Sequence, residues 1–422
     1  MQTISIIGAG ISGLALGQCL KDEFHVKIFE QASKPGGLIQ CDKVEGNLFH
    51  KVGGHVFNAK DKTVSDWFWS FFDKENEFIL TKRNAKIWLD GHFIGYPIED
   101  HLYQLEKNFS KRIIHDLLIR NKEEAGLITD FESFLIHNFG QTLYECYFKP
   151  YNMKIWKTDL SSVPLEWLEG KLPMPDLTSI ICNNIYREEE NVMVHSNFYY
   201  PKEGGSQFIA DRLAQKLDIS FCTPVTHIEK RKNHYLLNGE FKSDKLIYTG
   251  DVRKLGNVLN IDDPEIESAL EGVKHLRSNG TSNVLCECDP GELSWLYLPE
   301  AHTQAHRIIY TGNFSPLNNA VEKRPTCVVE FSGKVPIDIM EEEIQMLPGN
   351  LISLSHNYES NSYVIQDHES RSKIAHLKQL LESNHFYLLG RFAEWEYYNM
   401  DKAMEASMKL QKHLSFDRGL ST

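Results

Sequence analysis

A short glycine-rich loop near the N-terminus constrains the fold of this chain more than any other feature. The residues Ile4–Ile7 form an apolar run typical of a buried strand, and the spacing Gly8-x-Gly10-x-x-Gly13 follows directly. In this pattern the first glycine permits a tight turn, the second lets the backbone approach a pyrophosphate, and the third lets a helix pack closely on the strand. Free N–H groups at the start of that helix, around Ser12, favour bound phosphate. The loop therefore predicts a dinucleotide-binding unit.

An acid and a second glycine pair continue the cofactor pattern. Glu30 ends the next apolar run, where its carboxylate can bond both hydroxyls of a ribose. Gly36 and Gly37 follow closely and suit another near approach of the backbone to the cofactor. We find no second Gly-x-Gly-x-x-Gly after a strand, which argues against reductases that hold FAD and NAD(P)H in two separate domains. An oxidase that uses dioxygen and a reaction without net electron transfer both stay open.

Composition and charge limit the remaining classes of function. The chain has 422 residues, of which 41% are hydrophobic and 24% charged, as expected for a globular protein of two or three structural units. A formal net charge of −13 argues against nucleic acid as a partner, and no apolar run approaches the length of a membrane span. The 8 cysteines are scattered, without a Cys-x-x-Cys pair or a histidine cluster. We therefore expect no metal site and a cytoplasmic protein with reduced thiols.

The spacing of apolar residues predicts both helices and strands. Helical spacing of apolar residues is found from Asp61 to Phe72, over much of 101–197, after Gly204-Gly205, and from about Asp401 to Leu414. Asp90-Gly91 between apolar stretches predicts a hairpin, and residues 280–335 are expected to be rich in strands. The predicted fold class is α/β: a Rossmann-type cofactor domain with inserted mainly helical and antiparallel β-sheet substrate domains.

Several separated segments resemble one family of flavoenzymes. Glu30 followed by Gly36-Gly37 resembles the FAD-binding start of the amine-oxidase, protoporphyrinogen-oxidase and UDP-galactopyranose-mutase superfamily. The loop Gly53-Gly54-His55 is similar to the mutase loop whose glycine and histidine lie against the flavin ring. Tyr151-x-x-Lys154-x-Trp156 is similar to a mutase segment in the nucleotide-sugar cleft. These segments occur in the order in which the mutases have them.

The C-terminal half carries the most specific part of the resemblance. His306-Arg307-Ile308-Ile309-Tyr310 is similar to the mutase strand with a diphosphate-binding arginine, and Tyr363 stands where the mutases often have a phosphate-contacting tyrosine. The run from Gly390-Arg391 through Tyr397 to Asn399-Met400-Asp401 closely resembles the mutase pattern Gly-Arg-Leu-Gly-x-Tyr-x-Tyr-x-Asp-Met-Asp. Asn399 or Asp401 is expected to cap a final helix whose positive end faces the flavin.

The chain departs from the family pattern at several positions, among them Ala393 for a glycine and Trp395 for a tyrosine. Lys171 stands where the mutases usually have a diphosphate-binding arginine, so the charge is kept and the bidentate fork is lost. Asn399 replaces an aspartate. These departures leave the sugar and the nucleotide base open.

The resemblance implies a function and a set of roles. It implies interconversion of the pyranose and furanose forms of a nucleotide-diphosphate hexose, for cell-surface polysaccharide synthesis. A UDP-hexose is the first substrate that the resemblance implies. The N5 atom of reduced FAD is the implied nucleophile at the anomeric carbon, with His55, Arg307 and Arg391 as catalytic residues. The implied cofactor-binding residues are Gly8, Gly10, Ser12, Gly13, Glu30, Gly36, Gly37, Gly54, Arg391, Asn399, Met400 and Asp401. The implied substrate-binding residues are Tyr151, Trp156, Lys171, Arg307, Tyr363 and Tyr397.

The expected domains are discontinuous. Residues 1–60, 198–260 and 385–422 are expected to form the FAD-binding domain, and 101–197 a mainly helical substrate domain. Residues 61–100 and 261–384 are expected to form a β-sheet-rich domain that covers the flavin. Two alternatives stay open, an FAD-dependent oxidoreductase of the amine-oxidase or protoporphyrinogen-oxidase type and a catalytically idle flavoprotein scaffold. Whether the chain acts as a homodimer is also open.

Overall fold

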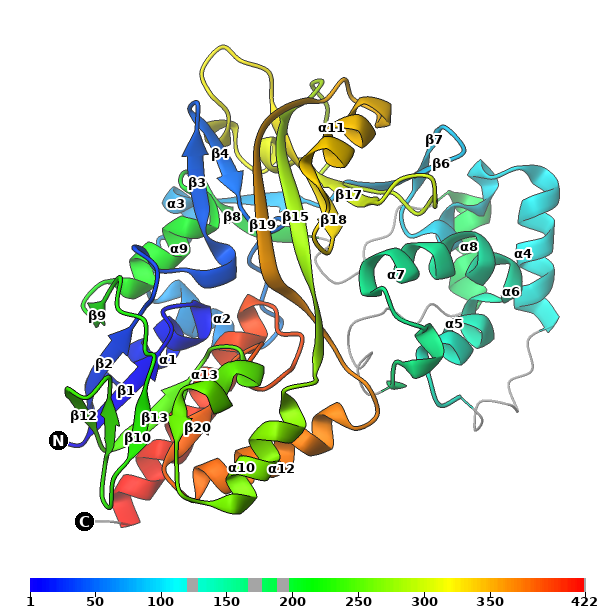
Figure 1. The fold of residues 1–422 in the computed structure, drawn as a ribbon. Helices are drawn as coiled ribbons and strands as arrows, with labels where there is room; N and C mark the ends of the chain where they lie inside the picture. Colours follow the sequence, from blue (N-terminus) through cyan, green and yellow to red (C-terminus); the bar gives the residue numbers. More distant parts are fainter. Residues whose placement is uncertain (120–127, 166–176, 188–196, 421–422) are drawn as a thin grey trace.

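A five-stranded parallel sheet is assembled from segments that lie far apart in the sequence. The computed structural model describes residues 1–119, 128–165, 177–187 and 197–420. Within them, the sheet has the order β20-β13-β1-β2-β9, and every neighbouring pair is parallel. The strands are β20 (Phe386–Leu388), β13 (Lys245–Tyr248), β1 (Thr3–Ile7), β2 (His25–Phe29) and β9 (Asp218–Ser220). Strands β1 and β20, one near each end of the chain, belong to this one sheet. The two ends of the chain therefore lie close together (Figure 1).

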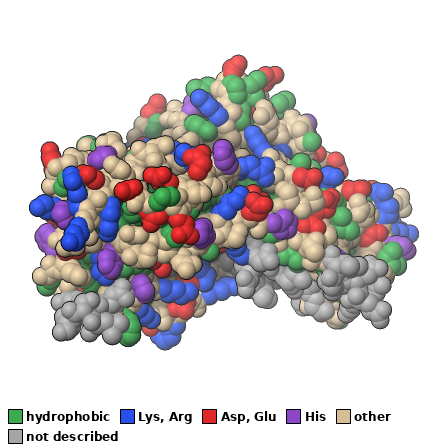
Figure 2. Space-filling view, turned by 60° about the horizontal axis from the view of Figure 1, so that its bottom comes forward, with side chains coloured by type: hydrophobic (Ala, Val, Ile, Leu, Met, Phe, Trp, Pro, Cys, Tyr) green, Lys and Arg blue, Asp and Glu red, His purple; other side chains and the backbone are tan. Residues whose placement is uncertain are grey.

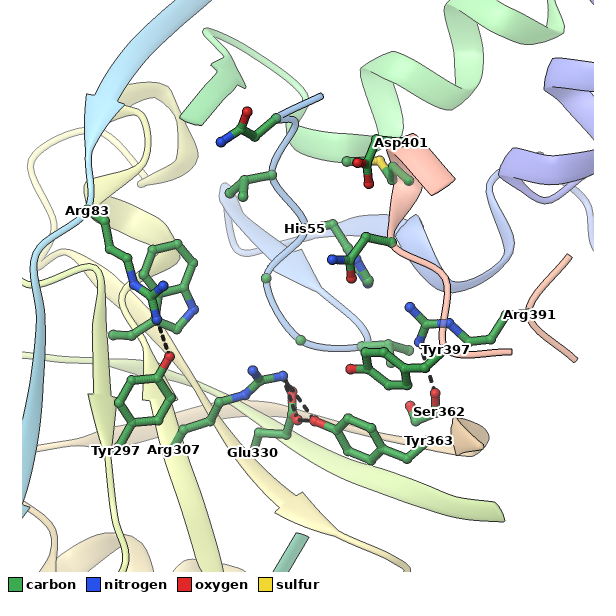
Figure 3. A pocket seen from close by; sticks show the side chains of 18 residues that line it. His55, Arg83, Tyr297, Arg307, Glu330, Ser362, Tyr363, Arg391, Tyr397 and Asp401 are labelled. Atoms are coloured by element: carbon green, nitrogen blue, oxygen red, sulfur yellow. Dashed lines mark hydrogen bonds and ion pairs between the residues drawn. The ribbon is translucent and has the colours of Figure 1, made fainter. Parts of the chain in front are cut away.

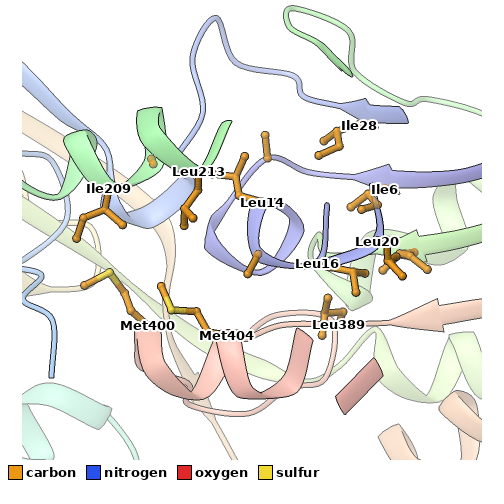
Figure 4. Close-up of a cluster of buried hydrophobic side chains, with 14 of the residues drawn as sticks. Ile6, Leu14, Leu16, Leu20, Ile28, Ile209, Leu213, Leu389, Met400 and Met404 are labelled. Atoms are coloured by element: carbon orange, nitrogen blue, oxygen red, sulfur yellow. The ribbon is translucent and has the colours of Figure 1, made fainter. Parts of the chain in front are cut away.

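Three helices cover one face of the parallel sheet. They are α1 (Ile11–Leu20), α9 (Gly205–Ala214) and α13 (Met400–Leu420). Figure 4 shows Leu14 of α1 beside Leu213 of α9 and Leu16 of α1 beside Leu389, and Leu14, Leu16 and Met404 of α13 are fully buried. Each such aliphatic side chain contributes roughly 1.5–3 kcal/mol through burial. The final helix, predicted from about residue 401, thus begins at the sheet and holds the last segment of the chain against it.

The opposite face of the parallel sheet is covered by α10 (Pro264–Val273) and α12 (Ser370–Glu382). Their buried residues share one core with Leu246 of β13 and Phe386 of β20. A small sheet of order β12-β11-β10-β14 also contributes to this core. Its strands are β10 (Ile228–Lys230), β11 (Tyr235–Leu237), β12 (Phe241–Ser243) and β14 (Leu259–Asn260). The core therefore joins residues on both sides of the domain boundary expected at residue 260.

A seven-stranded mixed sheet forms the middle of the molecule (Figure 1). Its order is β19-β15-β18-β17-β16-β6-β7, and only the β16–β6 pair is parallel. The strands are β6 (Ala85–Leu89), β7 (His92–Gly95), β15 (Arg277–Glu287), β16 (Trp295–Tyr297), β17 (Ala305–Ile309), β18 (Thr326–Ser332) and β19 (Ile352–Ile365). The predicted hairpin at Asp90-Gly91 is confirmed by the β6–β7 pair, and the predicted strand-rich region by β15 to β18.

The two faces of this mixed sheet have different roles. Helix α11 (Ile337–Met346) covers one face, where Val284, Ile308 and Val329 are buried with Met340. Residues on neighbouring strands that lie directly opposite each other share a face. The alternate residues Asn283, Glu330, Arg307 and Tyr297 are opposite one another across β15, β18, β17 and β16. They therefore form one polar row on the face turned away from α11.

A helical unit packs at the β6–β7 end of the mixed sheet (Figure 1). It contains α4 (Lys107–Ile119), α5 (Phe131–Phe139), α6 (Gln141–Leu143), a π-helical turn (Tyr144–Phe148), α7 (Lys149–Trp156) and α8 (Leu177–Tyr186), with 3-10 turns at Ile98–Gln104 and Leu160–Ser162. Buried residues of these helices share a core with Ile87 and Ile94 of the sheet.

The remaining elements are short and lie at the edges of the units. They are the ladder of β3 (Cys41–Val44) with β4 (Asn47–His50), the ladder of β5 (Phe78–Lys82) with β8 (Asn197–Pro201), and helices α2 (Lys62–Trp69) and α3 (Lys74–Glu77). Acidic and basic side chains are interspersed over the face drawn in Figure 2. Among the described residues, no helix combines the length and apolar character needed to cross a lipid bilayer.

Candidate functional site

The glycine-rich loop leads from β1 into α1 at the carboxyl edge of the parallel sheet. A Cβ atom on Gly13 would lie 2.0 Å from the carbonyl oxygen of Gly8, so only glycine lets the helix start this close to the strand. Gly10 forms a parallel bridge with Gly36, and the Gly36 amide donates to the Ala9 carbonyl at 2.8 Å. The two glycine pairs of the sequence are thus adjacent in space, and they build one wall of a cavity.

That cavity has a volume of about 410 Å³. Of the predicted cofactor-binding residues, it is lined by Gly8, Gly10, Ser12, Glu30, Gly36, Gly37, Arg391, Asn399 and Met400. The carboxylate of Glu30 accepts from the amides of Ala9 at 2.7 Å and Ala32 at 2.8 Å, which holds it in place at the end of β2. Gly13 lies behind this wall against Gly8, and the other two predicted residues, Gly54 and Asp401, line a second cavity instead. The wall has the features of a dinucleotide site: a strand, a glycine turn, a helix N-terminus and a fixed acid.

A second cavity, of about 210 Å³, opens beside the first. Four residues line both cavities: His55, Arg391, Asn399 and Met400. The second cavity is also lined by the predicted residues Gly54, Arg307, Tyr363, Tyr397 and Asp401 (Figure 3). A flat cofactor in the first cavity would therefore present one edge to the second.

The polar row of the mixed sheet forms the floor of the second cavity. Arg307 Nη2 donates to both carboxylate oxygens of Glu330, at 2.8 and 3.0 Å, and to the Tyr363 hydroxyl at 3.1 Å. The Tyr363 hydroxyl in turn donates to Glu330 Oε1 at 2.5 Å, and His306 Nε2 lies 2.9 Å from the same oxygen. A Cβ atom on Gly53 would meet Glu330 Oε2 at 2.9 Å, so a glycine is needed where this loop crosses the row.

The charge of Glu330 is retained although the residue is only 1% exposed. Burial alone would raise the pKa of its carboxyl group, but the Arg307 guanidinium and the hydrogen bonds from His306 and Tyr363 outweigh burial and lower it. Burial lowers the pKa of His306, so its ring is neutral and donates to the carboxylate. Glu330 therefore fixes the orientation of Arg307 and balances its charge.

His55 lies where the two cavities meet. Burial, followed by the neighbouring charge of Arg391, lowers the pKa of its imidazole to about 4. The ring is therefore neutral at physiological pH. Its Nε2 atom is buried without a hydrogen-bond partner among the described residues. A buried polar atom in this position is suited to a ligand that lies across both cavities.

Arg391 is held rigidly by backbone carbonyl groups. Its guanidinium donates to the carbonyl oxygen of Tyr398, at 3.0 and 2.5 Å, and to that of Ser362 at 3.0 Å. The same group lies 4.5 Å from the ring centroid of Tyr397. Directly afterwards, the carbonyl of Asn399 accepts from the Ala403 amide, which begins α13. The N-terminal end of α13, with its partial positive charge, thus points at both cavities.

Tyr151 and Trp156 do not line the described cavities directly. Trp156 packs edge-on against Tyr363 and Tyr397, with ring centroids 5.5 and 6.1 Å apart. Tyr151 packs edge-on against Tyr297 at 5.6 Å. All three tyrosine partners line the second cavity, so Tyr151 and Trp156 stand behind its wall. Lys171 lies outside the described residues.

Sequence reasoning missed two charged residues of the second cavity, Glu330 and Arg83. Glu330 is the single acid in the strand segment Cys327-Val328-Val329-Glu330-Phe331, and an isolated acid in an apolar strand is the signal that could have found it. Arg83 lies two residues before β6, the first strand of the predicted hairpin, and lines the cavity with Trp295 and Tyr297. Its sequence context carries no comparable signal.

The chain is similar to known proteins over its N-terminal part and over almost its full length. A family described as an NAD(P)-binding Rossmann-like domain matches residues 6–74. A protein of Klebsiella pneumoniae named probable UDP-galactopyranose mutase is 27% identical over 56% of the chain, although the match spans only 58% of that relative. A UDP-galactopyranose mutase of Mycoplasma genitalium is 23% identical over 97% of the chain and 94% of its own length.

Solved structures share the architecture. A reduced UDP-galactopyranose mutase superposes with a TM-score of 0.88 at 21% identity, covering 98% of this chain and 95% of its own. A putrescine oxidase double mutant superposes with a TM-score of 0.65 at 12% identity, covering 98% of this chain and 99% of its own. The fold is therefore one that serves enzymes of different reaction classes.

Proposed function

We propose that this chain, which is related over almost its full length to the UDP-galactopyranose mutases, is itself a flavin-dependent mutase that interconverts the pyranose and furanose forms of a nucleotide-diphosphate hexose. The observation that carries the proposal is the pair of adjoining cavities. One is built for a dinucleotide, the other holds Arg307, and both are lined by His55 and Arg391. A nucleotide sugar in the second cavity would place its diphosphate beside arginine and its sugar beside the cofactor.

The described residues fit FAD as the dinucleotide. The glycine walls leave room for a pyrophosphate at the start of α1, and Glu30 is fixed where a ribose would lie. The buried Nε2 atom of His55 needs a partner, and a flavin ring extending from the first cavity towards the second would supply one. The N-terminus of α13 adds partial positive charge near the same position, which favours an anionic reduced flavin.

Reduced flavin, when bound, supplies a nucleophilic nitrogen for the anomeric carbon of the sugar and is regenerated without net oxidation. The protein's part is to hold the leaving group. Arg307 stabilises the charge that develops on the departing diphosphate, and Glu330 with Tyr363 keeps its guanidinium in place. His55 stays neutral, so it can accept or donate one hydrogen bond without adding charge beside the cofactor.

The proposal is tested by incubating the protein, reduced with dithionite under anaerobic conditions, with a panel of UDP- and dTDP-hexoses. Chromatography is expected to resolve a furanose isomer from at least one member of the panel, and only after reduction. Rapid bleaching of the oxidised flavin by an amine or another reductant substrate, with recovery in air and no furanose product, would favour an oxidase instead. Bound flavin without binding of any nucleotide sugar would favour a catalytically idle scaffold.

A further inference from the structure

The hydroxyl group of Tyr297 has no part in the roles derived above, although the residue lines the second cavity (Figure 3). Tyr297 lies directly opposite Arg307 on the neighbouring strand, so the two side chains share the floor that the polar row forms. Residues paired in this way have Cβ atoms about 4.5–5.5 Å apart. A ligand group that meets the Arg307 guanidinium is therefore within reach of Tyr297.

Arg83 fixes the position of this hydroxyl group. Its Nη2 atom donates to Tyr297 Oη at 2.5 Å, and its guanidinium carbon lies 4.9 Å from the ring centroid of Tyr96 and 5.3 Å from that of Trp295. A guanidinium group only donates, so this bond occupies a lone pair of the hydroxyl oxygen and leaves the hydroxyl hydrogen for another acceptor. Because linked hydrogen bonds polarise one another, the bond from a cation also strengthens the hydroxyl as a donor.

No protein group accepts the Tyr297 hydroxyl hydrogen within the part of the chain that the structure describes, where the bond from Arg83 is the one hydrogen bond of this oxygen. The other phenol of the polar cluster differs, because the Tyr363 hydroxyl donates to Glu330. Polar hydrogens withdrawn from water usually have a partner. A ligand in the second cavity with an acceptor next to Arg307 would complete the hydrogen bonding of Tyr297.

We propose that Tyr297 is a further substrate-binding residue, which donates this hydrogen to a phosphoryl oxygen of the diphosphate that Arg307 binds. The inference rests on the proposed function, because it assumes a nucleoside diphosphate in the second cavity. Phosphoryl oxygens only accept hydrogen bonds and carry negative charge, which matches a hydroxyl group whose remaining capacity is to donate. Hydroxyl groups of the hexose and of the ribose also accept hydrogen bonds, so the experiment separates these three contacts.

Isothermal titration calorimetry of the flavin-loaded protein with UDP, UDP-galactose and uridine tests the contact without turnover. Tyr297→Phe removes the hydroxyl group and keeps the ring. It is expected to weaken the binding of UDP and of UDP-galactose by a similar factor, about 10- to 100-fold, as for loss of a hydrogen bond to a charged acceptor, and to leave the affinity for uridine unchanged. Tyr96→Phe is the matched control, because Tyr96 also packs on Arg83 but does not line the described cavities. It should leave the affinity for all three ligands unchanged.

Several outcomes would overturn the inference. If Tyr297→Phe binds UDP as tightly as the unsubstituted protein does, the contact is wrong while the proposed function stands. If it weakens UDP-galactose but not UDP, the hydroxyl contacts the hexose, and if it weakens uridine as much as UDP, the hydroxyl contacts the nucleoside. Equal losses in Tyr96→Phe would mean that the effect passes through Arg83.

Failure of the proposed function gives a different result, because the unsubstituted protein would then bind no UDP at all. Flavin content and thermal unfolding establish that each variant is folded. Tyr297→Leu, which also removes the hydroxyl group, takes the place of Tyr297→Phe if the latter does not load flavin.

Discussion

Glu330 joins three polar side chains in the interior, namely Arg307, His306 and Tyr363. Removing one member of a buried ion pair destabilises the folded protein mainly because the other charge is left without its partner. In this site Arg307 would be the charge left without a partner, and the proposed reaction needs its orientation. The residue is therefore expected to affect stability and substrate binding together.

Replacing Glu330 by glutamine keeps the shape of the side chain and removes its charge. We expect Glu330→Gln to lower the free energy of unfolding by about 3 kcal/mol, because the partly buried Arg307 would lose its counter-charge and the buried His306 and Tyr363 would lose a charged acceptor. Urea denaturation measures this change. Glu341 is the control, because it pairs with His356 at 2.6 Å but is 38% exposed. Glu341→Gln should cost less than about 1 kcal/mol, and equal effects of the two substitutions would contradict a special role for Glu330.

The buried residue His50 makes the free energy of unfolding depend on pH. Burial lowers the pKa of His50 to about 3, below its ordinary value of 6.5, and the residue is 1% exposed. Between pH 6.5 and 3 the unfolded chain therefore binds a proton at this position that the folded chain does not. The free energy of unfolding should fall as the pH is lowered through this window, by roughly 1.4 kcal/mol per pH unit from His50 alone.

Substituting His50 isolates this contribution from that of other titrating groups. His50→Asn should show a weaker decrease of unfolding free energy between pH 6.5 and 4 than the unsubstituted protein, whatever its stability at pH 7. Urea denaturation at closely spaced pH values provides both slopes. Two parallel slopes would mean that His50 does not resist protonation in the folded state.

The residues of the candidate site differ in how far they could be predicted. His55 and Arg391 lie in short local patterns, so their neighbourhood could be read from the chain itself. The structure brings them to the same cavity as Arg307, while their catalytic roles remain predictions. Glu330 and Arg83 enter the site only through the register of β6, β16, β17 and β18, which a single sequence does not reveal.

At the scale of elements, one lysine fastens α7 to the mixed sheet. Lys154 Nζ donates to the carbonyl oxygens of Leu298, Glu300 and Ala305, at 2.7, 2.7 and 3.0 Å. Burial lowers the pKa of this ammonium group to about 8. Lys154, in the segment Tyr151-x-x-Lys154-x-Trp156, therefore binds backbone carbonyl groups, and its ammonium group is not directed at the second cavity. Its effect on the site passes through α7, which carries Trp156.

Removing this ammonium group should loosen α7. We expect Lys154→Met to lower the free energy of unfolding by about 2 kcal/mol, because three partly buried carbonyl groups lose their donor. UDP affinity should also fall, since Trp156 supports Tyr363 and Tyr397. Lys149, exposed on the same helix, is the matched control, and Lys149→Met should change stability by less than about 0.5 kcal/mol. Similar losses of stability in both variants would contradict the role of Lys154 in holding α7 to the mixed sheet.

Elements with strong local signals were predictable, and their partners were not. The apolar run Ile4–Ile7, the turn Asp90-Gly91 and the final helix follow from periodicity and turn chemistry. The pairing of β13 with β1 joins residues 241 positions apart (Ile4 with Lys245), its pairing with β20 joins residues 140 apart (Leu246 with Phe386), and nothing in the local pattern encodes either. The same holds for α10 and α12, which pack on the parallel sheet although they follow residue 260.

At the scale of the whole molecule, two sheets of different construction meet at one hollow. The parallel sheet supplies the dinucleotide wall, and the mixed sheet supplies Arg307 and Glu330. Arg391 and the start of α13 lie at the junction of the two cavities. Because the Gly8–Gly13 and Gly36-Gly37 loops line only the first cavity and Arg307 with Glu330 lines only the second, cofactor affinity and substrate affinity should be separable by mutation at those positions.

The central claim is that reduced flavin serves many rounds of sugar isomerisation without being consumed. The most direct measurement is to reduce the bound flavin once under anaerobic conditions, remove the excess reductant, and add a large excess of UDP-galactose, or of whichever nucleotide hexose the panel identifies. Our account predicts many molecules of the furanose isomer per flavin while the absorption spectrum remains that of the reduced cofactor. Reoxidation of one flavin for each product molecule, or a spectrum that stays reduced with no furanose formed from any nucleotide hexose, would contradict it.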